Sequence, residues 1–254
     1  MAALFVFVLI VILAVSLTHR SKMKEITNIA ASYIKTMEAK DVSVIEEEIF
    51  NARWQTQLAE IKENLAEDPD AVWRNLKELG TVFMGDSRVV GFDVFGYFDE
   101  SRVLASAGAT IRLIPDSLDT LSVINPKIVL LGYGINDMNN TWYWESLDEY
   151  IEELNEHLKT LTELLPNAYI YVNSIIPVNE HGLETSYTWA AIPDWNEAIK
   201  KNCIEKGYRY LDISDLVAEH ADLYAEDGIH IQSAFYPYWA EALLTQYLSD
   251  VQGY

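Results

Sequence analysis

The sequence predicts an α/β fold in which helices cover both faces of a parallel β-sheet. Two features between residues 81 and 249 carry this prediction: short apolar runs without alternation, and helical stretches that separate them. An uninterrupted apolar run is typical of a strand buried on both faces, and the intervening helices make the right-handed crossovers that parallel strands require. With 254 residues, half of them hydrophobic, the chain can build one sizeable core but not two full enzymatic domains.

Five candidate strands alternate with five candidate helices in this part of the chain. The strands are expected at residues 81–84, 103–106, 128–131, 168–174 and 208–213. The helices are expected near residues 88–95, 112–123, 146–165, 190–206 and 237–249. Ligands of such sheets bind at the carboxyl ends of the strands, so the chemistry is expected there.

The segment before the first strand reads as helical. Apolar residues recur at spacings of three to five, which forms one stripe: Val42, Ile45, Ile49, Trp54, Leu58, Ile61 and Leu65. Asp68-Pro69-Asp70 interrupts the stripe, a short helix follows to about Leu79, and Gly80 marks its end. We interpret residues 23–80 as a helical neck; the alternative is that this segment packs along the core domain as a cover.

Residues 2–17 form a run of sixteen uncharged, almost wholly apolar residues. As a helix the run would span about 24 Å, slightly less than the ~30 Å of a bilayer core. It is either a short membrane anchor or a signal peptide. Because no basic residue precedes the run, we favour an uncleaved anchor over residues 1–22.

The charge balance and the single cysteine narrow the classes of partner. A formal net charge of −21 disfavours nucleic acid and anionic lipid as bound substrates, although acidic residues also simply keep a surface soluble. Cys203 is the only cysteine, so neither an intrachain disulfide nor a Cys/His metal cluster can form. We expect it to be an inert, buried residue.

Polar clusters follow several of the predicted strands. In chain order they are Gly85-Asp86-Ser87, Gly108, Gly134-Ile135-Asn136-Asp137 and, after a long loop, Asp227-Gly228-Ile229-His230. Because parallel strands end at one edge of a sheet, all four clusters are predicted to meet there. This convergence indicates a site more strongly than any one cluster does.

These residue types suit acyl-transfer chemistry. A serine hydroxyl is a weak nucleophile, so Ser87 needs a base, and His230 can take and return its proton near neutral pH. Asp227 can orient the imidazole ring. The backbone N–H groups of Ser87 and Gly108 and the Asn136 side-chain amide are candidate oxyanion donors, with Gly108 allowing close backbone approach. Each cluster alone could be an ordinary turn, loop glycine or helix N-cap.

Taken together, the four clusters resemble the blocks of the SGNH hydrolases, also called the GDSL esterase/lipase superfamily. The first block reads Val82-Phe83-Met84-Gly85-Asp86-Ser87, the second is Gly108, the third matches Gly-x-Asn-Asp and the last matches Asp-x-x-His. The resemblance covers about residues 81–249. Arg88 departs from it, because the motif that names the superfamily has leucine there.

This resemblance implies a fold and a set of roles for residues 81–254. The implied fold is a three-layer α/β/α sandwich with a five-stranded, flavodoxin-like parallel sheet, without metal or organic cofactor. The implied roles are nucleophile for Ser87, orienting acid for Asp227, base for His230, and oxyanion donors for Ser87, Gly108 and Asn136. The resemblance also favours an exported enzyme, facing outside the cytoplasm, whereas Arg20, Lys22 and Lys24 after the apolar run favour the opposite orientation.

The substrate is less constrained than the chemistry. Arg88 could bind a substrate carboxylate or pair with an acid such as Asp93. Trp142 and Trp144 follow the Asn136 loop, and aromatic residues there could form a sugar platform, an apolar wall or ordinary packing. We expect a carboxylic ester to be cleaved through an acyl-enzyme on Ser87, with an acylated cell-surface glycan as the first candidate. The alternatives are a lipid-directed esterase or acyltransferase, and a non-catalytic membrane-tethered binding module.

Overall fold

The computed structural model of this protein describes residues 22–24, 27, 28, 31, 35, 68 and 70–251. The chain divides into two compact units, Met1–Ala59 and Glu60–Tyr254, and the second contains the β-sheet. The expected anchor at residues 2–17 and most of the expected neck lie outside the described residues. No helix within the described part is long and apolar enough to cross a membrane.

Five parallel strands form the central sheet, in the order β2-β1-β3-β4-β5. The strands are β1 (Val82–Gly85), β2 (Val103–Ala105), β3 (Ile128–Gly132), β4 (Tyr169–Asn173) and β5 (Arg209–Leu211). Each lies where the sequence predicted a strand, and β5 is shorter than expected. This strand order is that of a flavodoxin-like sheet, so the predicted winding is confirmed.

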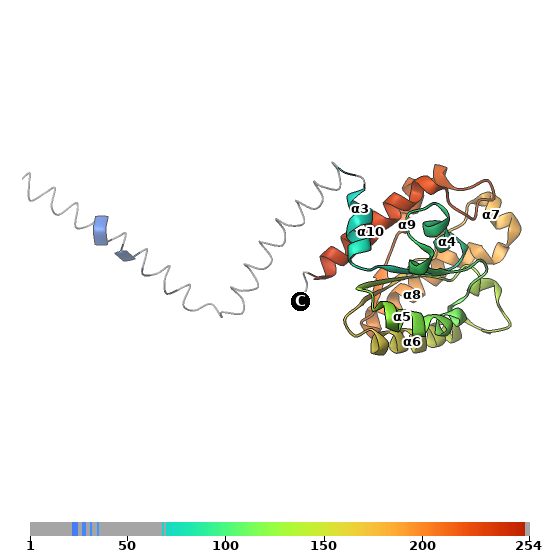
Figure 1. Ribbon diagram of the computed structural model, residues 1–254, viewed down its shortest axis with the longest axis horizontal. Helices are drawn as coiled ribbons and strands as arrows, with labels where there is room; N and C mark the ends of the chain where they lie inside the picture. The colour runs from blue at the N-terminus through green and yellow to red at the C-terminus, as the bar shows by residue number, and fades with distance from the viewer. Residues whose placement is uncertain are drawn as a thin grey trace, which may run out of the picture. The chain divides into compact units, whose positions relative to one another are not determined.

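Helices cover both faces of the sheet, as Figure 1 shows. One face carries α3 (Ala71–Glu78), α4 (Ser87–Val94), α9 (Ser214–Glu219) and α10 (Tyr236–Asp250). The other carries α5 (Leu118–Ile124), α6 (Leu147–Leu164) and α8 (Ile192–Lys206). A short helix, α7 (Glu180–Thr185), follows β4, and the sequence reading missed both α7 and α9.

The prediction of a helix over residues 112–123 is wrong in its first half. Two 3-10 segments, Ile111–Leu113 and Pro115–Ser117, precede α5, which begins only at Leu118. Proline has no N–H to donate and its ring clashes with the preceding turn of an α-helix. Pro115 therefore stops a continuous helix from forming, although the apolar spacing on both sides of it is helical.

The alternation of side chains along β1 divides the core into two layers. Val82 and Met84 pack into the hydrophobic layer shared with α5, α6 and α8. Phe83 points to the other face and stacks on Phe92 of α4 at 4.1 Å between ring centroids. Phe92 in turn contacts Trp239 of α10 at 5.1 Å. This aromatic layer fixes α4, and with it Ser87 at its first turn, against the sheet.

Helix α3 belongs to the same compact unit as the sheet. The Trp73 ring stacks on Tyr97 at 4.3 Å, and Leu76 is fully buried. The sequence predicted this helix as the end of a neck. For α3 the alternative reading applies, because it packs on the core domain.

Gly85 lies at a close approach between β1 and β3, where it is paired with Gly132. A Cβ atom there would lie 2.3 Å from the Gly132 carbonyl oxygen and 2.4 Å from Val89 Cγ2. We therefore expect Gly85→Ala to lower the free energy of unfolding by about 1–3 kcal/mol, the usual cost of overpacking a core. Urea unfolding followed by circular dichroism measures this change. An unfolding midpoint equal to that of the parent would show that the strands separate without cost.

Candidate active site

Ser87 lies where β1 passes into α4, and the turn is fixed by its neighbour Asp86. The Asp86 backbone N–H donates to the Gly132 carbonyl at 3.1 Å, and its side chain caps α4 by accepting from the Arg88 N–H at 2.9 Å. Ser87 is the first residue of the helix, where backbone N–H groups have no partner in the helix itself. Within residues 70–251 its N–H donates no backbone hydrogen bond, so it is free for a ligand.

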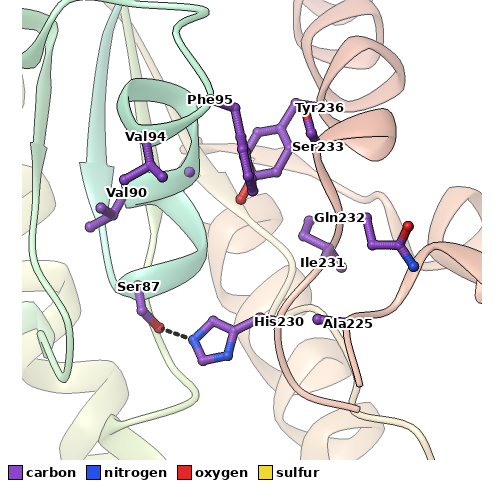
Figure 2. Close-up of a pocket in the computed structure, with 11 residues that line it drawn as sticks. Ser87, Val90, Val94, Phe95, Ala225, His230, Ile231, Gln232, Ser233 and Tyr236 are labelled. Atoms are coloured by element: carbon purple, nitrogen blue, oxygen red, sulfur yellow. Dashed lines mark hydrogen bonds between the residues drawn. The ribbon is translucent and has the colours of Figure 1, made fainter. Parts of the chain in front are cut away.

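His230 and Asp227 complete a continuous series of hydrogen bonds that begins at Ser87. His230 Nε2 lies 2.8 Å from Ser87 Oγ (Figure 2). On the other side of the ring, His230 Nδ1 lies 2.6 Å from Asp227 Oδ2. An ionised carboxylate can only accept, so it holds the ring in the tautomer with the proton on Nδ1. Nε2 is then the acceptor for the Ser87 hydroxyl proton, which is the arrangement a general base requires.

Asp227 stays ionised because it is hydrogen-bonded on both oxygens. Oδ1 accepts from the backbone N–H groups of Ile229 and His230, each at 2.9 Å. Partial burial works to raise the pKa of Asp227, but the His230 ring and these two backbone donors outweigh it and lower the pKa to about 2. The negative charge next to the imidazole therefore persists at any pH at which the protein is assayed.

The loop that carries both residues is closed on itself. The Ala225 N–H donates to the His230 carbonyl at 2.8 Å, and Tyr224 pairs with Ile231 in an antiparallel bridge. The Gly228 carbonyl accepts from the Asn179 N–H at 3.0 Å, which ties the loop to the segment after β4. These bonds hold the His230 ring in place without a regular helix or strand.

The two further oxyanion candidates lie on loops after β2 and β3. The backbone of Gly108 has φ of +76°, a conformation that other residues rarely adopt, and its N–H donates no backbone hydrogen bond in the described part of the chain. Nothing described lies within 4 Å of a Cβ built there. This conformation is itself a reason for glycine at the position. Asn136 Nδ2 donates one hydrogen to the Ala109 carbonyl at 3.0 Å, which leaves its second hydrogen for a ligand.

Asp137 joins these two loops, a role that the sequence reading did not assign. Its side chain is only 2% exposed, and its two oxygens accept from the Ile111 N–H at 2.9 Å and the Gly134 N–H at 2.8 Å. Burial raises the pKa of Asp137 to about 7, although these bonds work to lower it. Because this pKa lies above that of the unfolded chain, the group's contribution to stability is present in acid and is lost as the pH rises through about 7.

Arg88, a predicted substrate contact, is buried and already paired. Its guanidinium lies 3.3 Å from Asp86 Oδ2 and donates to the Ile176 carbonyl at 2.6 Å. A substrate carboxylate cannot reach it, so that prediction is wrong. The alternative prediction, that Arg88 pairs with an acid, is confirmed, although the acid is Asp86 and not Asp93. Asp86 is therefore a structural residue of the turn.

The two tryptophans proposed as substrate contacts have different environments. Trp144 is buried in the hydrophobic core, and its Nε1 donates to Glu153 Oε2 at 2.8 Å. It is therefore a packing residue, and its prediction as a contact is wrong. Trp142 is 92% exposed and Tyr187, on the loop after α7, is exposed as well, so both can meet a large ligand.

A cavity of about 430 Å³ adjoins the Ser87–His230 pair, and sequence reasoning missed it. Figure 2 shows it between α4 and the segment that runs from Ala225 to Tyr236. The signal was present in the sequence: Val90 and Val94 follow Ser87 by three and seven residues, which places all three on one helix face.

The described residues contain no group of three or more His, Cys, Asp or Glu side chains arranged to hold a metal ion. Cys203 is free and buried, as expected, and burial raises the pKa of its thiol to about 12. The thiolate, which is the reactive form, is therefore disfavoured at neutral pH.

A serine, a histidine and an aspartate joined in series at the carboxyl edge of a parallel sheet define the class of serine hydrolases. The family model of the GDSL-like lipase/acylhydrolases matches residues 83–236, which is more than half of the chain. The chain belongs to this family and is a serine ester hydrolase, and the resemblance noted in the sequence is confirmed.

Several solved structures are similar to this chain at low sequence identity, and those with a TM-score above 0.5 share its fold. A GDSL-like lipase from Bacteroides thetaiotaomicron has a TM-score of 0.55 at 17% identity, over 76% of this chain and 99% of that one. A protein from Bacteroides fragilis assigned as an acylhydrolase has a TM-score of 0.53 at 15% identity, over 68% and 87%. An acetylxylan esterase from Geobacillus stearothermophilus has a TM-score of 0.47 at 19% identity, over 65% and 91%. No curated protein matches the chain.

Asp137 offers a test of how the loops at this edge are held. In Asp137→Asn only one side-chain oxygen can accept, so the amide group faces a backbone N–H that has lost its partner. We expect kcat for p-nitrophenyl acetate at pH 8 to fall by about 10- to 100-fold, somewhat less than the loss of one oxyanion donor causes.

The matched control is Asp119→Asn, which changes an exposed carboxylate on α5 and should keep the parental kcat. Far-UV circular dichroism verifies that both variants are folded. A folded Asp137→Asn variant with the kcat of the parent would show that the two loops keep their geometry without this carboxylate.

Proposed function

We propose that the protein hydrolyses a carboxylic ester through an acyl-enzyme on Ser87, with His230 as general base and acid and Asp227 as the residue that orients it. The observation that carries the proposal is the hydrogen-bond series itself, with 2.8 Å between Ser87 Oγ and His230 Nε2 and 2.6 Å between His230 Nδ1 and Asp227. These distances suit proton transfer without rearrangement.

In the first step, His230 Nε2 takes the hydroxyl proton as Ser87 Oγ attacks the ester carbonyl carbon. The carbonyl π electrons move onto oxygen, and the resulting oxyanion accepts from the Ser87 and Gly108 N–H groups and from the second Asn136 Nδ2 hydrogen. Such donors, fixed before the reaction, are worth about 10²–10³-fold each in kcat. Asp227 stabilises the imidazolium without taking its proton.

In the second step, the tetrahedral intermediate collapses and the bond to the leaving oxygen breaks. His230 gives its proton to that oxygen, which releases the alcohol and leaves the acyl group on Ser87. A water molecule then loses a proton to His230 and attacks the acyl carbon, so the carboxylic acid departs and the Ser87 hydroxyl is restored. An acceptor alcohol in place of water would make the same site an acyltransferase.

Among the substrate classes expected from the sequence, an ester with a hydrocarbon group is favoured by the apolar cavity beside Ser87. The acylated-glycan proposal depended partly on Trp144, which is buried, and now rests on Trp142 and Tyr187. An anchor at residues 2–17 with the domain outside the cytoplasm remains part of the proposal. It would hold the enzyme close to esters of the cell envelope.

The nucleophile is tested by replacing the Ser87 hydroxyl. We expect Ser87→Ala to lower kcat for p-nitrophenyl acetate by about 10⁴-fold or more, because no acyl-enzyme can form. Turnover of the full-length protein in detergent micelles is measured as p-nitrophenolate release. The measurement is repeated after the product has been washed out.

The control is Ser122→Ala, which removes an exposed hydroxyl from α5 and should leave turnover unchanged. Comparable turnover in Ser87→Ala and the parent would exclude Ser87 as the nucleophile. A parent without turnover on any p-nitrophenyl ester would favour the non-catalytic binding module instead.

A further inference from the structure

We propose that the cavity beside Ser87 and His230 binds a hydrocarbon group on the alcohol side of the ester. We name it the α4 pocket: it lies between α4 and residues 225–236. The inference rests on the proposed function, because it assigns one half of the substrate of that reaction to a defined place.

The lining of the α4 pocket is apolar on two opposing sides. Figure 2 shows Val90 and Val94 on the α4 side, facing Ile231 across the cavity. Phe95 packs on the Tyr236 ring at 5.2 Å between ring centroids. The one hydroxyl of Tyr236 is not available to a ligand, because it donates to the Arg88 carbonyl at 2.6 Å. With few polar groups to pair, the pocket favours hydrocarbon over a sugar or another polar group.

The size and exposure of the pocket also fit a bound chain. A cavity of about 150 Å³ holds benzene, and this one measures about 430 Å³, which leaves room for a chain of at least six carbons. Val94 is 68% exposed and Phe95 is 42% exposed, although both are large and apolar. A ligand that covers them gains the free energy of removing this surface from water.

The chemistry of the site places the alcohol, rather than the acyl chain, on this side. The carbonyl oxygen must point toward Gly108 and Asn136, and neither residue lines the α4 pocket. The leaving oxygen must approach His230 Nε2, which returns the proton, and His230 does line it. The group bonded to the leaving oxygen therefore enters the pocket, while the acyl group lies outside it.

The experiment compares two ester series on the full-length protein in detergent. In the alcohol series, the acyl group is the one whose p-nitrophenyl ester the parent hydrolyses fastest, and the alcohol is ethyl, butyl or hexyl. In the acyl series, ethyl esters carry acetyl, butyryl or hexanoyl groups. Each buried methylene can contribute up to about fourfold in kcat/KM, so we expect the parent to prefer hexyl over ethyl esters by about tenfold or more.

Val94→Asp places a charge at the mouth of the pocket and should remove most of that preference, with Val94→Ser intermediate. The matched control is Val123→Asp on α5, since Val123 is 85% exposed and lies outside the pocket; it should keep the parental preference. Because all variants see the same micelles, partitioning of the esters cancels in the comparison. In the acyl series, the dependence of kcat/KM on acyl length should be the same in the parent and in all three variants.

The inference is overturned if Val94→Asp and Val94→Ser keep the hexyl preference, if the parent has none, or if the substitutions alter the acyl series in place of the alcohol series. A failure of the proposed function would give a different result, because the parent would then hydrolyse no ester of either series.

Discussion

The hydrogen bond between Ser87 Oγ and His230 Nε2 joins residues 143 positions apart in the chain, and both ends must be held for it to form. At the Ser87 end, the constraint is the tight passage from β1 into α4, capped by Asp86 and bound to the Gly132 carbonyl. At the His230 end, it is a loop closed by its own backbone hydrogen bonds and by Asp227. The sheet supplies the common edge at which these two constructions meet.

The buried pair of Asp86 and Arg88 illustrates how the nucleophile turn is stabilised in this chain. Both side chains are almost fully buried, and the guanidinium also bonds to the Ile176 carbonyl after β4. A buried charge without its partner is strongly unfavourable, so the two residues depend on each other. Arg88 thus connects α4 to the segment after β4. At the position of Arg88, the motif that names the SGNH/GDSL superfamily has a leucine, which could make no such bond.

The sequence was sufficient for the sheet and for the Ser87, His230 and Asp227 arrangement, because apolar strands and the polar residues after them follow a local pattern. Prediction from the sequence failed where contacts between distant residues decide the local structure. Pro115 ends a helix whose apolar spacing continues across it. Arg88 and Trp144 were candidate substrate contacts in the sequence, but both are buried and bonded to carboxylates of the chain itself. Asp137 was indistinguishable from a turn residue, since its two backbone donors come from loops that only the folded sheet brings together. The α4 pocket forms between two segments that lie 130 residues apart in the sequence, from Phe95 to Ala225.

The central claim is that one serine, activated by His230, forms a covalent bond to the substrate. Labelling the full-length protein with an alkyl fluorophosphonate, which reacts with activated serine hydroxyls, and mapping the adduct by peptide mass spectrometry tests this most directly. The account predicts a single adduct on Ser87 and its near-complete loss in His230→Gln. An adduct on a different serine, or undiminished labelling of Ser87 without the imidazole, would contradict it.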